Sequence, residues 1–291
     1  MVKGKWTKGI VSEIEGVGEK KWAVDYIIDE KLREYFSEAS KKLSFEANVL
    51  LEEQEKSFSV SHGNIKDDLL DGVPTYFLDP ICYSTDHSRW LMINKSVFPS
   101  RAFFIGGWTD KSYSDATLTD MKVGIHYSLG SRNYFIGLQV DSGRYITLLN
   151  GSEYTLPDFS YIQKPILAFA CYSNSGYDII GKVASEMSKK YSVFMGTGGT
   201  ALDQALVFEG RIEGLLDLRA LIARDKGASL MPHDIAAIYP LSKGLGLAVS
   251  RVSGNLANAR IFGEEPIDII LARKEIHNKV RDNVLEILKN I

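Results

Sequence analysis

The sequence has few cysteines, no excess of charge of either sign and no long apolar run. Only Cys82 and Cys171 occur in 291 residues, which argues against a disulfide-stapled secreted domain and predicts a cytoplasmic protein. Lys and Arg number 34 against 37 Asp and Glu, and the net charge of −3 argues against a nucleic-acid-binding protein. The best apolar run, 165–171, is far shorter than the about 20 residues of a membrane span, and the N-terminus has no apolar signal-peptide core.

The pattern over residues 1–155 predicts an α+β half. Residues 21–42 carry apolar side chains at the three-to-four spacing of a helix. An apolar run at 46–53 ends in two carboxylates, the polar and Gly/Asp-rich stretch 57–74 predicts an exposed loop, and 75–78 predicts a short buried strand. Aromatic and β-branched runs around 101–108, 121–127, 134–140 and 144–149 are separated by turn residues, which predicts antiparallel strands.

From about residue 160 the predicted strands and helices alternate, which is typical of an α/β half. We expect strands at 165–173, 191–195, 214–219 and 267–272, and helices at 176–190, 200–210, 233–245 and 274–290. The stretch 151–160 is rich in Gly, Pro and polar residues and separates the two patterns. We therefore expect a mixed α/β protein whose halves span 1–155 and 156–291.

Acidic residues stand at or near the ends of several predicted elements. Glu52 follows a strand, Asp79 precedes Pro80 at the end of another strand, Asp234 begins a helix and Asp29 belongs to the first helix. Carboxylates at strand ends leave the core and can face a cleft, and hard cations such as Mg²⁺ take oxygen ligands. Taken singly, each acid also fits a solvated surface charge or, for Asp234, a helix N-cap.

The order of these acids along the chain resembles the inositol monophosphatase family, in the superfamily that also contains fructose bisphosphatases. Four segments carry the resemblance: VLLEEQ (49–54), FLDPICYST (77–85), MGTGGTALDQALVFEGRIEGLLDLR (195–219) and MPHDIAA (231–237). The second segment resembles a damaged form of the signature DPIDGT or DPIDGS. The resemblance implies a layered α/β/α/β/α sandwich of the sugar phosphatase type, an active site between its two halves, and a homodimer.

The resemblance also implies roles for individual residues. Divalent metal, with Mg²⁺ as the expected ion, would be held by oxygen atoms of Glu52, Asp79, the Ile81 carbonyl and Asp234. The implied catalytic residues are Ser84, which would orient the attacking water, and Asp29, as the acid of an N-terminal loop. The implied substrate contacts are the backbone amides of Tyr83 and Ser84, which would face the phosphate, and the residues Gly198, Gly199, Thr200 and Asp217.

The signature departs from the family pattern at two positions. Cys82 stands where the family has a second metal-binding acid, and a soft thiol suits Mg²⁺ poorly, so Mn²⁺ or Zn²⁺ are alternatives. Tyr83 replaces a glycine that lets the backbone approach phosphate. Three interpretations stay open: a phosphatase with a modified site, where Asp86 or His87 supplies a substitute ligand; an impaired hydrolase; and Cys82 as a small buried apolar residue.

The glycine-rich turn after the strand at 191–195 supports a rival hypothesis. Gly196, Gly198 and Ala201 satisfy the dinucleotide fingerprint, and Asp217 follows about 20 residues later, where a ribose-binding acid would sit. A tight turn in which Thr200 caps the next helix explains the same residues. We expect a divalent-metal-dependent phosphomonoesterase for a small phosphorylated cyclitol or sugar. The alternatives are an impaired family member that binds a phosphorylated ligand or a protein partner, and a dinucleotide-binding protein.

Overall fold

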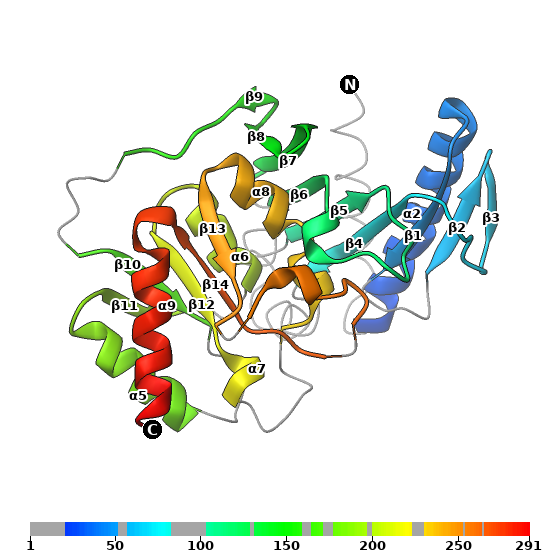
Figure 1. The fold of residues 1–291 in the computed structure, drawn as a ribbon. Coiled ribbons are helices and arrows are strands. Elements are labelled where there is room, and N and C mark those ends of the chain that lie inside the picture. The colour runs from blue at the N-terminus through cyan, green and yellow to red at the C-terminus, as the bar shows by residue number, and fades with distance from the viewer. Residues whose placement is uncertain are drawn as a thin grey trace.

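The structure is a computed structural model that describes residues 21–51, 57–82, 103–128, 131–158, 164–170, 177–196, 200–222, 230–252, 254–263 and 265–291. Its elements stack in layers (Figure 1). Helix α2 (Lys21–Leu43) packs on one face of a nine-stranded sheet, and α6 (Thr200–Phe208) and α8 (Ile238–Gly244) lie between that sheet and a five-stranded one. Helices α5 (Tyr177–Ser188) and α9 (Lys274–Lys289) cover the far side. This arrangement confirms the expected α/β/α/β/α sandwich.

The first sheet has the strand order β3-β2-β1-β4-β5-β6-β7-β8-β9. Its strands are β1 (Glu46–Leu51), β2 (Phe58–Ser61), β3 (Asn64–Lys66), β4 (Thr75–Cys82), β5 (Phe103–Thr109), β6 (Val123–Ser128), β7 (Tyr134–Asp141), β8 (Arg144–Leu149) and β9 (Ser152–Glu153). β1 and β4 are parallel, whereas β4 to β8 form an antiparallel series. The antiparallel strands expected in the middle third are therefore confirmed.

The second sheet has the strand order β11-β10-β12-β14-β13. Its strands are β10 (Ile166–Phe169), β11 (Ser192–Met195), β12 (Gly214–Asp217), β13 (Leu247–Ser250) and β14 (Ile269–Arg273). β10, β11 and β12 are parallel, and β14 runs antiparallel to both of its neighbours. Because β10, β11 and β12 are parallel, their carboxyl ends lie at the same edge of the sheet, where α/β proteins bind ligands.

Short helices complete the described chain: η2 (Leu118–Asp120), α7 (Arg219–Ile222), η4 (Pro232–Ile235) and η5 (Leu256–Asn258). None of the described helices combines the length and the apolarity that a membrane crossing requires. In α9, Val280 and Val284 are fully buried one turn apart, as the predicted apolar face requires.

Three apolar clusters correspond to the three contacts between layers. The largest lies between the two sheets and includes Phe77 from the first sheet, Leu241 from α8 and Leu271 from the second sheet. A second cluster lies under α2, and a third lies under α5 and α9. The largest cluster fixes the relative position of the two sheets, and therefore of any site built between them.

Some local expectations were wrong. The stretch 57–74 contains β2 and β3 rather than only a loop, because Phe58 and Val60 are buried under α2 and the intervening Ser59 donates its hydroxyl to the Asp68 carbonyl at 2.7 Å. The helix expected over 233–245 is divided into η4 and α8, and the strand expected at 75–78 continues to Cys82. No strand was expected at β13.

Candidate active site

The end of β4 forms the first wall of the candidate site. Phe77 and Asp79 lie on the same face of this strand, because side chains two residues apart share a face. Phe77 belongs to the cluster between the sheets, whereas Leu78 belongs to the cluster under α2. Asp79, only 4% exposed, is therefore directed at the junction between the two halves of the sandwich.

A β-bulge follows Asp79. The pairing of β4 with β5 shifts its register between Asp79 and Cys82, so that one extra residue of β4 is accommodated there. Pro80 explains the position of the bulge, because proline has no N–H to give to the ladder. Ile81, whose carbonyl is a predicted metal ligand, lies in this irregular segment.

The 3₁₀ helix η4 forms the second wall and carries Asp234. Asp234 Oδ2 accepts a hydrogen bond from the Met231 backbone N–H at 2.8 Å. His233 Nε2 lies 3.5 Å from the other carboxylate oxygen, Oδ1. Asp234 is therefore not the N-cap that the alternative expected: Met231 is the N-cap of η4, and Asp234, at the third helical position, accepts the hydrogen bond from its backbone N–H.

Two glycines seat the chain after η4 directly on the first sheet. Gly124 of β6 and Gly137 of β7 are register partners. A Cβ atom at Gly124 would lie 2.4 Å from the Ala237 carbonyl oxygen, and one at Gly137 would lie 2.5 Å from the Leu241 backbone nitrogen. Only glycine permits this approach, so the sheet that carries Asp79 also sets the position of the segment that follows Asp234.

An aromatic stack joins the two walls. The Phe262 ring stacks on Phe77 of β4, with 5.1 Å between ring centroids, and on His233 of η4, with 6.0 Å between centroids. β4 and η4 also contact each other directly. Asp79 is two residues from Phe77 and Asp234 adjoins His233, so the two elements that carry these predicted metal ligands pack against each other.

The electrostatics of Asp234 are those of a desolvated acid. Burial raises the pKa of its carboxyl group from 3.8 to about 6, and the nearby Asp217 charge adds to the rise. The hydrogen bond from Met231 and the positive charge of Arg219 lower this pKa and only partly oppose the effect of burial. Water still reaches 22% of the Asp234 side chain.

The carboxyl end of β12 and the start of α6 form the third wall. Asp217, the last residue of β12, is fully buried, and Arg219 is paired with it at 2.6 Å between Nη2 and Oδ2. Arg219 Nη2 also donates to the Thr200 hydroxyl at 3.3 Å. Arg219 therefore ties the end of β12 to the first residue of α6.

The described acids fit a hard divalent cation in donor type. Asp79 and Asp234 supply carboxylate oxygens from two elements in contact, and burial is the largest cause of the raised pKa of Asp234. Within the described part of the chain, no three His, Cys, Asp or Glu residues gather into a metal-binding group. A complete ligand set would therefore need Glu52, which lies outside that part.

The structure does not describe several of the predicted site residues. Glu52, Tyr83, Ser84, Gly198 and Gly199 lie outside the described residues. The backbone of Asp29 lies within α2, as expected for the first helix, and its side chain lies outside the described part of the structure.

The dinucleotide hypothesis receives no support from the acid on which it depends. β11 and α6 provide the expected strand and helix around the glycine-rich turn. Asp217, however, has no exposed surface, and both of its carboxylate oxygens accept hydrogen bonds from Arg219. A ribose hydroxyl would find no acceptor there.

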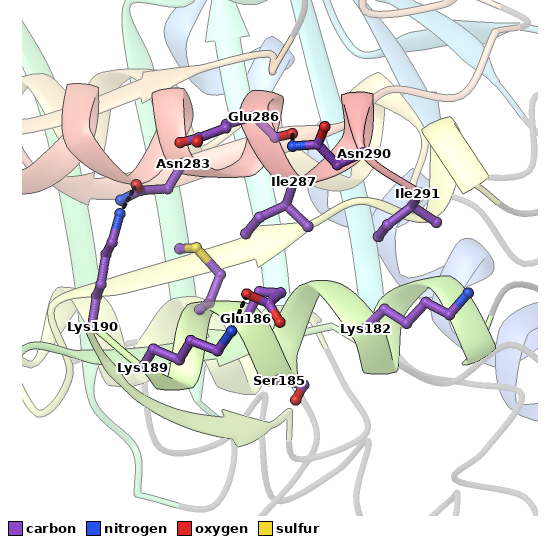
Figure 2. Close-up of a pocket in the computed structure, with 11 residues that line it drawn as sticks. Lys182, Ser185, Glu186, Lys189, Lys190, Asn283, Glu286, Ile287, Asn290 and Ile291 are labelled. Atoms are coloured by element: carbon purple, nitrogen blue, oxygen red, sulfur yellow. Dashed lines mark hydrogen bonds and ion pairs between the residues drawn. The ribbon is translucent and has the colours of Figure 1, made fainter.

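A pocket of ≈ 470 Å³ opens between α5 and α9, on the outer side of the second sheet (Figure 2). Two of its lysines have polar partners: Lys189 Nζ lies 2.5 Å from Glu186 Oε2, and Lys190 Nζ donates to Asn283 Oδ1 at 2.6 Å. None of the described residues that line it was predicted for the site. We therefore treat it as separate from the junction of the two halves.

Sequence reasoning missed the residues that assemble this site. Phe262, the pair Gly124 and Gly137, and Arg219 carry no chemistry that a motif search would select. The only signal for Arg219 in the sequence was its place two residues after Asp217, close enough for its side chain to reach the Asp217 carboxylate.

The chain matches no known family model, and no curated protein matches its sequence. Its fold does match solved structures. An IMPase from Thermotoga maritima is 19% identical, with a TM-score of 0.58 over 87% of this chain and 79% of that one. A calcium-bound IMPase family protein from Staphylococcus aureus is 17% identical, with a TM-score of 0.62 over 96% of this chain and 90% of that one.

An IMPase/NADP phosphatase complexed with Mg²⁺ and phosphate is 14% identical, with a TM-score of 0.57 over 88% of this chain and 79% of that one. The chain therefore has the fold of inositol monophosphatase family proteins, as its motifs predicted.

Proposed function

We propose that the protein is a divalent-metal-dependent phosphomonoesterase that hydrolyses a small phosphorylated cyclitol or sugar. The observation that supports this proposal is the contact between β4, which carries Asp79, and η4, which carries Asp234, in an inositol monophosphatase fold. A structural neighbour that binds Mg²⁺ and phosphate supports both the cation and the class of substrate.

In this proposal Asp79 and Asp234, together with Glu52 and the Ile81 carbonyl, hold Mg²⁺ or Mn²⁺. The bound cations supply positive charge to the oxygens that attack and leave the phosphorus atom. The closely packed walls around Asp79 limit the access of bulk water, which strengthens every charge interaction inside the site.

The remaining predicted residues act on the phosphate, the water and the ring. The Ser84 hydroxyl orients the attacking water, and Asp29 is the second catalytic candidate. The substrate contacts come from the Tyr83 and Ser84 amides on the phosphate side and from Gly198, Gly199 and Thr200 on the ring side. Asp217 is not among these contacts, because Arg219 occupies its carboxylate.

The test is phosphate release from a panel of inositol and sugar phosphates with Mg²⁺, Mn²⁺ and Zn²⁺. We expect metal-dependent release that Asp79→Asn abolishes without unfolding the protein, because this variant keeps the shape of the side chain and removes its charge. An absence of release with every ion from folded protein would eliminate the enzyme.

Cys82 favours a second candidate, an impaired hydrolase that binds a phosphorylated ligand or a protein partner. Cys82 is the last residue of β4, after the bulge that follows Asp79, and a thiol is in general a poor ligand for Mg²⁺. Replacing a lost metal ligand can restore about three decades in rate. We expect Cys82→Asp combined with Tyr83→Gly to raise kcat/KM with Mg²⁺ by at least about tenfold. A fall instead would show that Cys82 belongs to a working variant site.

Two further parts of the proposal concern the whole protein. We infer a homodimer from the resemblance and a cytoplasmic location from the scarcity of cysteine. Sedimentation equilibrium and fractionation of the native source test them, and a monomer at micromolar concentration contradicts the first.

A further inference from the structure

A buried ion pair closes the carboxyl end of β12. Arg219 donates from Nε to Asp217 Oδ1 at 2.9 Å and from Nη2 to Asp217 Oδ2 at 2.6 Å, the bidentate geometry of a strong arginine–carboxylate pair. The Arg219 backbone N–H and a second contact from Nε reach the same carboxylate, each at 3.2 Å. Side-chain exposure is 4% for Arg219 and 0% for Asp217.

These contacts occupy Asp217. Each of the two Asp217 oxygens accepts two hydrogen-bond contacts from Arg219, whose Nε–H is shared between them. To receive a substrate hydroxyl, Asp217 would have to separate from Arg219 and leave two buried charges without their partners, which is strongly unfavourable. The substrate contact that the family resemblance implies for Asp217 does not agree with this geometry.

Arg219 also reaches the next wall of the site. Its Nη2 donates to Thr200 Oγ1 at 3.3 Å, and Thr200 is the first residue of α6 and is 5% exposed. The guanidinium thus has Asp217 on one side and Thr200 on the other. It spans the space between the end of β12 and the start of the helix that follows β11.

We propose that Arg219 is a positioning residue which, anchored by Asp217, holds the start of α6 in the place that substrate binding requires. For the choice of ligand this inference rests on the proposed function, in which Thr200 and the two preceding glycines contact the substrate. Lysine cannot take over this role, because an ammonium group is a point charge without the planar fork that grips a carboxylate and still reaches a hydroxyl.

The first test needs no turnover. Amide hydrogen exchange of the full-length protein is compared between wild type, Arg219→Gln, Asp217→Asn and Thr200→Val. We expect exchange over 204–207, the first amides with acceptors inside α6, to accelerate by about tenfold in all three variants, since each weakens the hydrogen bonds that hold the helix start. Exchange in α9, which lies on the far side of the second sheet, should stay unchanged. Unchanged exchange over 204–207 in Arg219→Gln overturns the proposal.

The second test measures KM and kcat with the best substrate of the panel. We expect Arg219→Gln and Asp217→Asn each to raise KM about tenfold while kcat changes by less than about threefold. Arg219→Lys should raise KM as Arg219→Gln does, because an ammonium group cannot grip Asp217 and still reach Thr200. A rise of KM in Asp217→Asn but not in Arg219→Gln would instead make Asp217 a direct substrate ligand and overturn the proposal.

Two controls keep the outcomes distinct. If Arg219→Gln fails to fold, the combined Asp217→Asn and Arg219→Gln variant removes both charges, and the same exchange and KM changes are expected of it. If wild type hydrolyses no phosphate, the proposed function fails, and the exchange experiment alone decides whether Arg219 positions α6.

Discussion

Replacing Asp234 by Asn should stabilise the metal-free protein. Asn keeps an oxygen that can accept the Met231 N–H hydrogen bond and removes a charge that the folded state disfavours. The pKa of Asp234 rises from 3.8 to about 6, and each pKa unit corresponds to ~1.36 kcal/mol, so ionised Asp234 lowers the free energy of unfolding at pH 7.5 by about 3 kcal/mol. The residual 22% exposure of the side chain makes this value an upper bound.

The sign of the pH dependence follows from the direction of the shift. Because folded Asp234 binds its proton more tightly than unfolded Asp234, its contribution favours folding at low pH and is lost as pH rises from about 4 to about 6. The advantage of Asp234→Asn over wild type should therefore fall to about 1 kcal/mol at pH 4.5.

The assay is urea unfolding in EDTA at pH 7.5 and pH 4.5, with Asp115→Asn as a matched control on an exposed aspartate. The control should lie within about 0.5 kcal/mol of wild type. Mn²⁺ at about 1,000 times Kd should reverse the order, because wild type alone then gains about 4.1 kcal/mol. If Asp234→Asn unfolds at the same or a lower urea concentration than wild type in EDTA at pH 7.5, Asp234 is not a desolvated site carboxylate and the reasoning fails.

Three further variants test the assembly of the site. Burial lowers the pKa of His126 to about 4. Between pH 7.5 and pH 5 the free energy of unfolding of wild type should therefore fall by about 2 kcal/mol more than that of His126→Gln. A difference between the two proteins that stays constant with pH would contradict this. Gly124→Ala should lower the free energy of unfolding in urea by about 3 kcal/mol and weaken Mn²⁺ binding measured by calorimetry. Gly181 lies in α5 with open space around it, so Gly181→Ala should not destabilise the protein. Phe262→Leu should lower the free energy of unfolding by about 1–2 kcal/mol and also weaken Mn²⁺ binding. Phe104 packs with the cluster under α2, so Phe104→Leu should lower stability alone. Equal Mn²⁺ affinities of the two variants would refute the role of the aromatic stack.

The sequence predicted the parts of this fold whose signal is local. Helix α9 and strands β5 to β8 follow from periodicity, because each buries one face at regular spacing. The order of Asp79 and Asp234 along the chain, each within its own motif, likewise pointed to one shared site. The exposed loop expected over 57–74 was wrong, because a few buried side chains in this polar stretch define β2. The sequence does not show that α2 buries them.

What the sequence could not predict depends on contacts between distant segments. Asp217 has the position of a substrate ligand, but its environment is set by Arg219, and only the folded chain shows that both are buried together. Gly124 and Gly137 look like ordinary strand glycines until the backbone of Ala237 and Leu241 is placed on them.

The central claim is that Asp79 and Asp234 share a divalent cation in a phosphatase site. Crystals soaked with Mn²⁺ and inorganic phosphate test it most directly, because manganese gives an anomalous signal. We predict an anomalous peak about 2–2.6 Å from an oxygen of each carboxylate, with phosphate density beside it. The absence of a peak between the two acids, or carboxylates more than about 10 Å apart, which is too far to share one ion, would contradict the account.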